Sequence, residues 1–174
     1  MEYFEFYNLP ISFLVDEKSL KSQFLKKSRE FHPDFYTLES KEKQEDILKS
    51  SSLNNAAYKV LKDFDLRMKY ILTQSGTLQG EGKDKLEQSF LMEMMDINEA
   101  LMELQFEPNE AGSQKILSQI KAFETELKTD VEDFLEKEIN SLSADDLESV
   151  KQYYLKKKYL NRLEENLSKI NLSL

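Results

Sequence analysis

The tripeptide His32-Pro33-Asp34 places an imidazole and a carboxylate side by side, and it holds the only histidine of the chain. Proline restricts the backbone, so this loop would present both groups just beyond a helix, where Asp34 could pair with an arginine of a partner. As a catalytic pair the tripeptide is weak, because no nucleophile is near in sequence and no second histidine is available for a metal. The alternative is a surface turn with a capping aspartate.

The helix predicted to precede the tripeptide has one apolar and one cationic face. Asp16 is a plausible N-cap, and Pro33 ends the helix near Phe31 because a residue before proline leaves the helical region. The apolar stripe consists of Leu20, Phe24 and Phe31. At about 100° per residue, Lys18, Ser22, Lys26 and Arg29 lie on the opposite side. Simple solvation of the helix surface is the alternative reading of these charges.

Composition narrows the protein class. Only 4 glycines and 3 prolines among 174 residues favour an all-α protein. The absence of cysteine excludes disulfides, thiolate metal sites and thiol nucleophiles within this chain. A net charge of -9 argues against nucleic acid as a partner, because attraction to phosphates dominates that affinity. No apolar run approaches the roughly 20 residues of a membrane span, and the acidic, aromatic start is unlike a targeting signal, so we expect a cytoplasmic protein without a membrane partner.

The chain divides at a glycine-rich stretch. Residues 1–76 carry 12 basic and 12 acidic side chains, whereas residues 77–174 carry 12 and 21. Three of the four glycines lie between residues 74 and 84, which predicts an N-terminal domain over 1–75, a linker over 76–85 and a C-terminal domain over 86–174. Helices are predicted over 40–61, with a break near Asp63 and a further helix or turn to Leu72, and over 86–104, 113–140 and 144–171, with Ser143 as a possible N-cap. The last three predict an antiparallel bundle.

The helix predicted from Leu86 carries two apolar stripes. Its first stripe suffices to face a bundle core and consists of Phe90, Met94, Ile97, Leu101 and Leu104. The second consists of Leu91, Met95 and Met102, with Asp96, Glu99 and Glu103 beyond it. An exposed apolar patch rimmed by acids is typical of a recognition surface, and methionine suits adaptable contacts. The alternative is a central helix that buries both stripes.

Several motifs together resemble a known family. In the first half they are Leu20 and Phe24 on the basic helix, the His-Pro-Asp tripeptide, and then Leu53, Asn54, Ala56, Tyr58, Leu61, Arg67, Tyr70, Ile71 and Leu72. In the second half they are Phe90, Leu91, Met92, Glu93, Met95, Asp96 and Glu99, and the run from Tyr159 to Leu163. With these residues nearly the whole chain resembles the HscB-type J-domain proteins, the iron–sulfur cluster co-chaperones. One departure is Phe64, which replaces a usual proline after Lys62 and Asp63 and would only extend a helix.

The resemblance implies an N-terminal J-domain, a helical hairpin with a His-Pro-Asp loop, that stimulates the ATPase of a DnaK- or HscA-type chaperone. It also implies that the bundle delivers the iron–sulfur scaffold protein. Implied chaperone-binding residues are His32, Pro33, Asp34, Lys18, Lys21, Lys26, Lys27 and Arg29. Scaffold-binding residues are Leu91, Met92, Met95, Asp96, Glu99, Glu103 and Tyr159. No catalytic residue, metal ligand or cofactor is expected, and nothing argues for an oligomer.

Two functions from different classes of partner remain open at this stage. The first is delivery of the iron–sulfur scaffold, with assistance to cluster transfer and maturation of iron–sulfur proteins. The second is a J-domain co-chaperone that delivers another client. An independent enzyme has little support, because acids such as Asp145 and Asp146 lie where helix capping explains them.

Overall fold

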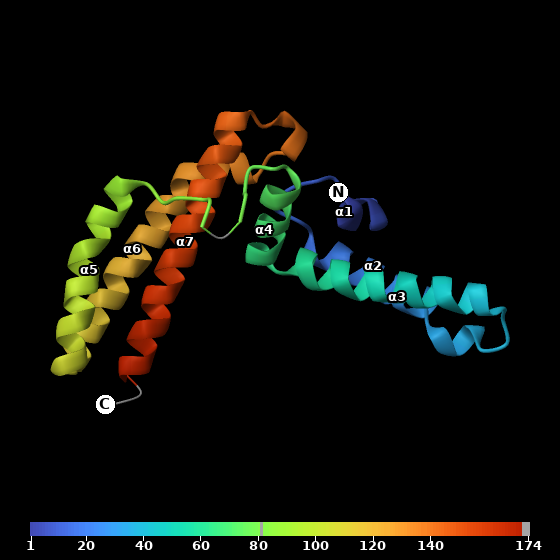
Figure 1. Cartoon of the computed structure of the whole chain (residues 1–174), viewed down its shortest axis with the longest axis horizontal. Coiled ribbons are helices and arrows are strands. Elements are labelled where there is room, and N and C mark those ends of the chain that lie inside the picture. Colours follow the sequence, from blue (N-terminus) through green and yellow to red (C-terminus); the bar gives the residue numbers. More distant parts are fainter. Residues whose placement is uncertain (81, 172–174) are drawn as a thin grey trace. The chain divides into compact units, whose positions relative to one another are not determined.

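The computed structural model describes residues 1–80 and 82–171 (Figure 1). Within these residues the chain forms seven α-helices and two short 3-10 helices, and no strand beyond a single β-bridge. The predicted all-α class is therefore confirmed. In chain order the elements are α1 Glu2–Phe6, α2 Glu17–Glu30, η1 Pro33–Tyr36, α3 Lys41–Lys62, α4 Phe64–Gln74, α5 Gln88–Phe106, α6 Glu110–Leu135, η2 Ile139–Ser141 and α7 Ala144–Asn171.

Side-chain caps determine where most of these helices begin. Asp16 accepts a hydrogen bond from the N–H of Lys18 at 3.0 Å, and Ser40 and Ser143 cap α3 and α7 in the same way. Asp63 has extended backbone angles and caps α4, which confirms the helix break predicted near this residue, and Phe64 starts a new helix rather than extending α3. Helix α6 begins at Glu110, three residues earlier than predicted, because Asn109 accepts a hydrogen bond from the N–H of Gly112.

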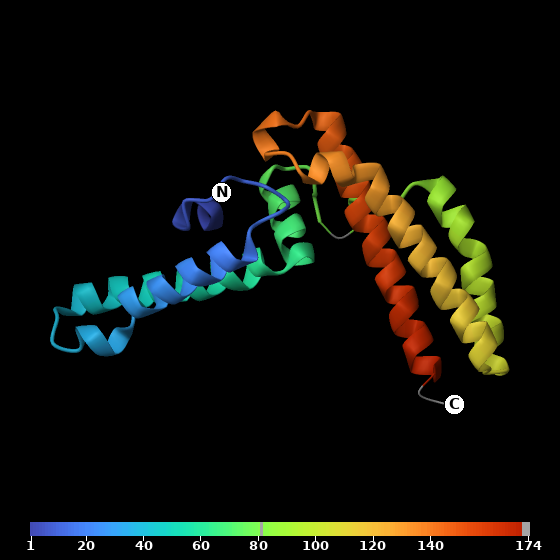
Figure 2. The same cartoon turned by 180° about the vertical axis from the view of Figure 1, so that it is seen from behind.

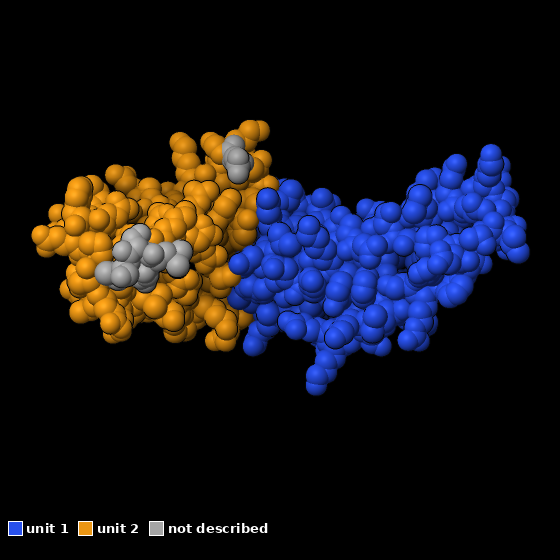
Figure 3. All heavy atoms as spheres, turned by 90° about the horizontal axis from the view of Figure 1, so that it is seen from below, with its two compact units in different colours: residues 1–76, 135–142 blue, residues 77–134, 143–174 orange. Residues whose placement is uncertain are grey.

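The chain forms two compact units, coloured separately in Figure 3. The N-terminal unit comprises residues 1–76 together with residues 135–142, and the C-terminal unit comprises residues 77–134 and 143–174. Residues 135–142, which begin at the last residue of α6, thus belong to the N-terminal unit. We call them the returning segment.

The N-terminal unit is built around the paired helices α2 and α3, which run side by side in Figures 1 and 2. Leu20 of the predicted stripe is fully buried, and the ring of Phe24 stacks on Tyr58 with 4.1 Å between centroids. Phe31 is half-buried at the end of α2. These contacts hold α2 with its apolar side on α3, which leaves its other side free for charged residues.

A buried arginine ties the ends of several elements together in this unit. Arg67 on α4 is only 3% exposed, and its guanidinium donates to the carbonyl oxygens of Phe13, at 2.8 Å, and Leu61. Burial lowers the pKa of Arg67, and the nearby carboxylates of Glu17 and Asp63 oppose that shift. A charged group this deep is tolerated because its donors reach carbonyl acceptors.

The returning segment pairs with the stretch between α1 and α2. The N–H of Ile139 donates to the carbonyl oxygen of Ile11 at 2.9 Å, and Ser12 and Glu138 form an antiparallel β-bridge. Ile139 and Leu135 are 7% and 2% exposed. The N-terminal unit therefore takes part of its structure from a stretch more than a hundred residues downstream.

The C-terminal unit consists of α5, α6 and α7, which lie side by side in both views (Figure 2). All five residues of the first predicted α5 stripe are at most 4% exposed, which confirms that this stripe faces the core. The remaining buried side chains of this core are Ile116, Ile120, Leu160, Leu163, Leu167 and Ile170. One face of α5 thus anchors it to its neighbours.

Candidate functional sites

The His-Pro-Asp tripeptide forms an exposed, ordered turn at the end of α2. His32 is the N-cap of η1, with its Nδ1 accepting a hydrogen bond from the N–H of Asp34 at 3.3 Å. The N–H of Phe35 donates to the carbonyl oxygen of His32 at 3.1 Å. The capping side chain is therefore His32 and not Asp34. The carboxylate of Asp34 remains available to a partner, because 81% of its side chain is exposed.

Two side chains outside the tripeptide brace this turn, and sequence analysis did not single them out. The hydroxyl of Tyr36 donates to the carbonyl oxygen of Glu30 at 2.7 Å. The amide nitrogen of Gln44 donates to the carbonyl oxygens of Thr37 and Glu39 at 3.2 and 3.0 Å. These bonds link the turn to the end of α2 and the start of α3. No helical periodicity marks either residue.

The basic residues of α2 fall into two groups. Lys18, Lys21, Lys26 and Arg29 are exposed. Lys27 is half-buried instead, with its Nζ 4.3 Å from the centroid of the Phe6 ring and 5.6 Å from that of Phe31. Contact with aromatic faces stabilises an ammonium group. Lys27 thus helps to hold α1 against α2, while the other four leave their charges in solvent.

The second stripe of α5 is exposed, so the alternative of a fully buried helix is wrong. Leu91 is 41% exposed, and Met92, Met95 and Met102 are each exposed by more than 60%. We call these four residues the methionine face. Asp96, Glu99 and Glu103 are also exposed and adjoin it on the helix. Large apolar side chains gathered on one exposed helix face are typical of a protein interface.

Tyr159 on α7 occupies a different position from the methionine face. It is half-buried, and its hydroxyl accepts a hydrogen bond from the amide nitrogen of Asn98 at 2.9 Å. Its ring meets Phe90 edge-on with 5.7 Å between centroids. Tyr159 therefore braces α5 against α7 beside the core.

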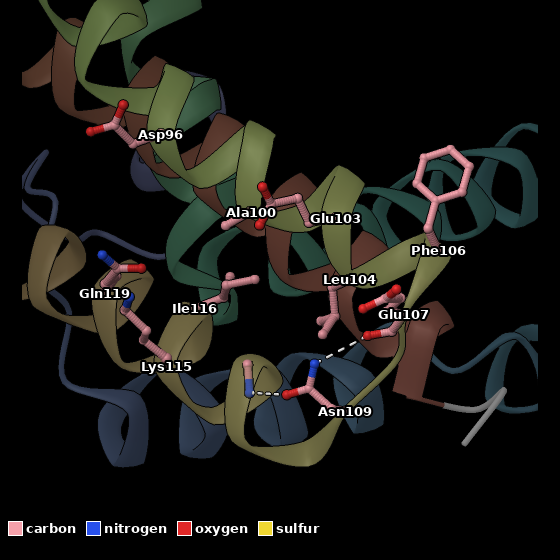
Figure 4. A pocket seen from close by; sticks show the side chains of 11 residues that line it. Asp96, Ala100, Glu103, Leu104, Phe106, Glu107, Asn109, Lys115, Ile116 and Gln119 are labelled. Atoms are coloured by element: carbon pink, nitrogen blue, oxygen red, sulfur yellow. Dashed lines mark hydrogen bonds between the residues drawn. The ribbon is translucent and has the colours of Figure 1, made fainter.

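A groove of about 650 Å³ lies between α5 and the first turns of α6 (Figure 4). Asp96 and Glu103 line its α5 side, and Lys115 and Gln119 project from α6. Asn109 holds the turn at one end by accepting from Gly112 at 2.7 Å and donating to the carbonyl oxygen of Glu107 at 3.1 Å. Two acids that border the methionine face thus also border this groove.

Across residues 1–80 and 82–171, no group of three or more histidine, aspartate or glutamate side chains is arranged to hold a metal ion. None of the helices in these same residues is long and apolar enough to cross a membrane.

The chain is 32% identical over 167 residues to the mouse iron–sulfur cluster co-chaperone protein HscB. The aligned residues make up 95% of this chain and 67% of the mouse protein. This chain belongs to the HscB co-chaperone family. The family model described as "HSCB C-terminal oligomerisation domain" matches residues 86–168.

Other HscB proteins are similar to this chain in sequence or in fold over nearly its full length. The Haemophilus influenzae HscB homologue is 28% identical over 169 residues, which cover 96% of this chain and 93% of that protein. The crystal structure of human HscB matches with a TM-score of 0.77 at 31% identity, covering 100% of this chain and 84% of that one. The HscB assignment therefore rests on both sequence and fold, and places this chain among proteins of iron–sulfur cluster assembly.

Proposed function

We propose that this protein is a J-domain co-chaperone that stimulates the ATPase of a DnaK- or HscA-type chaperone and delivers an iron–sulfur scaffold protein to it. Through this delivery it assists cluster transfer and the maturation of iron–sulfur proteins. It regulates its partner's active site and has none of its own. The exposed, capped His-Pro-Asp turn in a chain of the HscB family carries the proposal.

The chaperone site lies on the N-terminal unit. Four exposed basic residues of α2 attract an acidic chaperone surface, and His32, Pro33 and Asp34 make the contact that stimulates hydrolysis. The η1 hydrogen bonds support this role because they hold the imidazole and carboxylate in one arrangement before the chaperone binds. Preorganisation of this kind lowers the entropic cost of association. Asp34 would form a charge-assisted pair with an arginine of the chaperone.

The scaffold site lies on α5 of the C-terminal unit. The methionine face supplies the apolar contacts, and Asp96, Glu99 and Glu103 supply a charged rim. Such an arrangement of apolar centre and polar rim is common at protein interfaces. Tyr159 contributes by fixing α5 through Phe90 and Asn98.

Single-turnover ATP hydrolysis by the DnaK-type chaperone of the same organism tests both halves of this proposal. We expect this protein to accelerate hydrolysis, and a cysteine-bearing iron–sulfur scaffold to increase the acceleration further. Acceleration that ignores the scaffold would support a J-domain co-chaperone with another client. An unchanged hydrolysis rate would contradict the chaperone role.

We also propose that the protein acts as a monomer in the cytoplasm, without nucleic acid, cofactor or membrane as partner. Sedimentation equilibrium should give a mass near the 20.5 kDa of one chain. A concentration-dependent dimer mass would contradict this and would agree with the description of the matching family model.

A further inference from the structure

The groove between α5 and α6 has an apolar floor and a charged rim. Leu104 and Ile116 are 3% and 2% exposed and lie between the two helices, beside Ala100 (Figure 4). Asp96, Glu103 and Glu107 line its α5 side. At one end lies Phe106, which is 83% exposed. The groove thus offers both an apolar surface and three carboxylates to anything that enters it.

The groove is held in shape by close packing at the start of α6. A Cβ atom on Gly112 would lie 3.0 Å from Leu104 Cδ1 and 3.0 Å from Asn109 Oδ1. Such a distance is tighter than ordinary van der Waals contact, so glycine allows α6 to start directly against α5. The wall opposite the carboxylates is therefore a fixed part of the C-terminal unit.

Lys115 is the basic residue in this lining, and it stands on α6 across from the acids. Its neighbours four residues away on the helix are Ala111 and Gln119, which offer no carboxylate for an intrahelical ion pair. Lys115 is exposed. Its charge therefore opposes entry of a cation and favours entry of an anion, which makes it a residue that can set selectivity.

The groove also adjoins the proposed scaffold site. Asp96 and Glu103 line the groove and border the methionine face, so a partner that covers Met95 and Met102 reaches the groove without a gap. A lysine or arginine side chain suits this place, because its methylene stem packs on an apolar floor while its charged end stays near carboxylates.

We propose that the groove receives a lysine- or arginine-bearing segment of the same scaffold protein, and that Lys115 limits the affinity for it. This inference rests on the proposed function. It extends the scaffold site from one helix to two, adding Phe106, Glu107 and Lys115 to the contact residues. Selectivity of this kind combines an attractive and a repulsive element in one site.

Titration calorimetry of the full chain with an iron–sulfur scaffold protein of the same organism tests the inference. The observation that decides it is whether a change of charge in the groove raises or lowers the Kd. Lys115→Glu should lower the Kd about threefold at low ionic strength, which is the size expected for exposed charges. Glu107→Gln should raise the Kd. Both effects should vanish near 1 M salt, where the Debye length is about 3 Å.

Matched controls separate the groove from overall charge. Lys121→Glu is the control for Lys115→Glu, because it makes the same change of net charge at an exposed position of the same helix. Glu165→Gln is the control for Glu107→Gln, because it removes one carboxylate at another exposed position. Both should leave the Kd within about 1.5-fold, since distant exposed charges contribute little. If the Kd of Lys115→Glu for the scaffold equals that of Lys121→Glu, or is higher than that of the unaltered chain, the groove assignment alone is overturned. No scaffold binding by the unaltered chain would overturn the scaffold role and the groove together.

Discussion

Tyr7 and Asn54 meet in the interior of the N-terminal unit, where the phenolic hydroxyl donates to Oδ1 of Asn54 at 2.7 Å. The amide nitrogen of Asn54 donates in turn to the carbonyl oxygen of Phe24 at 3.2 Å and to Oγ of Ser28 at 3.0 Å. One asparagine, 1% exposed, therefore connects α1, α2 and α3. Because α2 leads directly into the His-Pro-Asp turn, this network supports the helix that carries the proposed chaperone site.

Replacement of Asn54 by alanine should destabilise the protein. The hydroxyl of Tyr7 would keep only the backbone carbonyl oxygen of residue 54 as an acceptor. The hydrogen bonds of the Asn54 side chain to Tyr7, Phe24 and Ser28 would be lost, and each contributes about 0.5–1.5 kcal/mol. We expect a loss of about 2 kcal/mol in the free energy of unfolding, measured by urea denaturation. Asn55→Ala, at the exposed neighbouring position, is the control and should change stability by less than about 0.5 kcal/mol. Equal effects of both changes would contradict a structural role for the network.

Alkaline pH should weaken the fold partly through Tyr7. Burial, with a smaller contribution from Tyr58, raises the pKa of Tyr7 above its ordinary value. The unfolded chain ionises its tyrosines near pH 10, so the folded state retains a proton that the unfolded state releases. Stability is then complete below about pH 10 and falls as the pH rises beyond it.

Comparison with Tyr7→Phe isolates this contribution. The variant lacks the ionisable group, so its free energy of unfolding should fall less steeply between about pH 9 and pH 11. Burial also raises the pKa of Tyr70, which leaves a residual slope in the variant. Denaturation curves at several pH values measure both slopes. Parallel curves would mean that Tyr7 ionises equally in the folded and unfolded chain.

His32→Gln should abolish ATPase stimulation without unfolding the protein. The His32 side chain is 51% exposed, so its loss removes little packing. Thermal denaturation should give a midpoint within about 2 °C of the original, as surface changes usually do. Glu39→Gln, in the exposed loop after the same turn, is the control and should retain stimulation. Stimulation that survives His32→Gln would remove the basis of the J-domain proposal.

Truncation of the exposed face of α5 should weaken binding, whereas truncation of its buried face should weaken the fold. Leu91→Ala combined with Met95→Ala should weaken scaffold binding by about 1–2 kcal/mol per side chain, because both are exposed residues of the proposed scaffold site. Basal ATPase stimulation and stability should persist. Met94→Ala should instead lower the free energy of unfolding by about 2–5 kcal/mol, since Met94 is fully buried. Calorimetry and urea denaturation of the same variants distinguish the two faces; unchanged scaffold affinity in the double variant would contradict the proposed interface.

Local signals in the sequence predict much of this fold. Asp16 and Ser143 each begin a helix where a capping side chain was expected, and α3 begins next to Ser40, where a helix start was predicted, because a cap acts within a few residues of itself. The core stripe of α5 follows from helical periodicity alone. The exposure of its second stripe does not, since the same periodicity fits a central helix as well as an edge helix.

Features that depend on distant residues escaped prediction. Helix α1 has only five residues, too few for a periodic pattern, and is held by Tyr7 and by the contact between Phe6 and Lys27. That contact also explains why Lys27 differs from its basic neighbours on α2. The returning segment depends on a backbone hydrogen bond between Ile139 and Ile11, which no side-chain pattern encodes.

The returning segment has a consequence for biosynthesis. Residues 1–76 leave the ribosome first, but the partner of Ile11 lies about 60 residues beyond that point. At about 5–20 residues per second, the ribosome adds Ile139 roughly 3–12 s later. During this interval the nascent N-terminal unit exposes the surface that Leu135 and Ile139 later cover. Completion of the N-terminal unit, which carries the proposed chaperone site, therefore awaits translation of most of the C-terminal unit, which carries the proposed scaffold site.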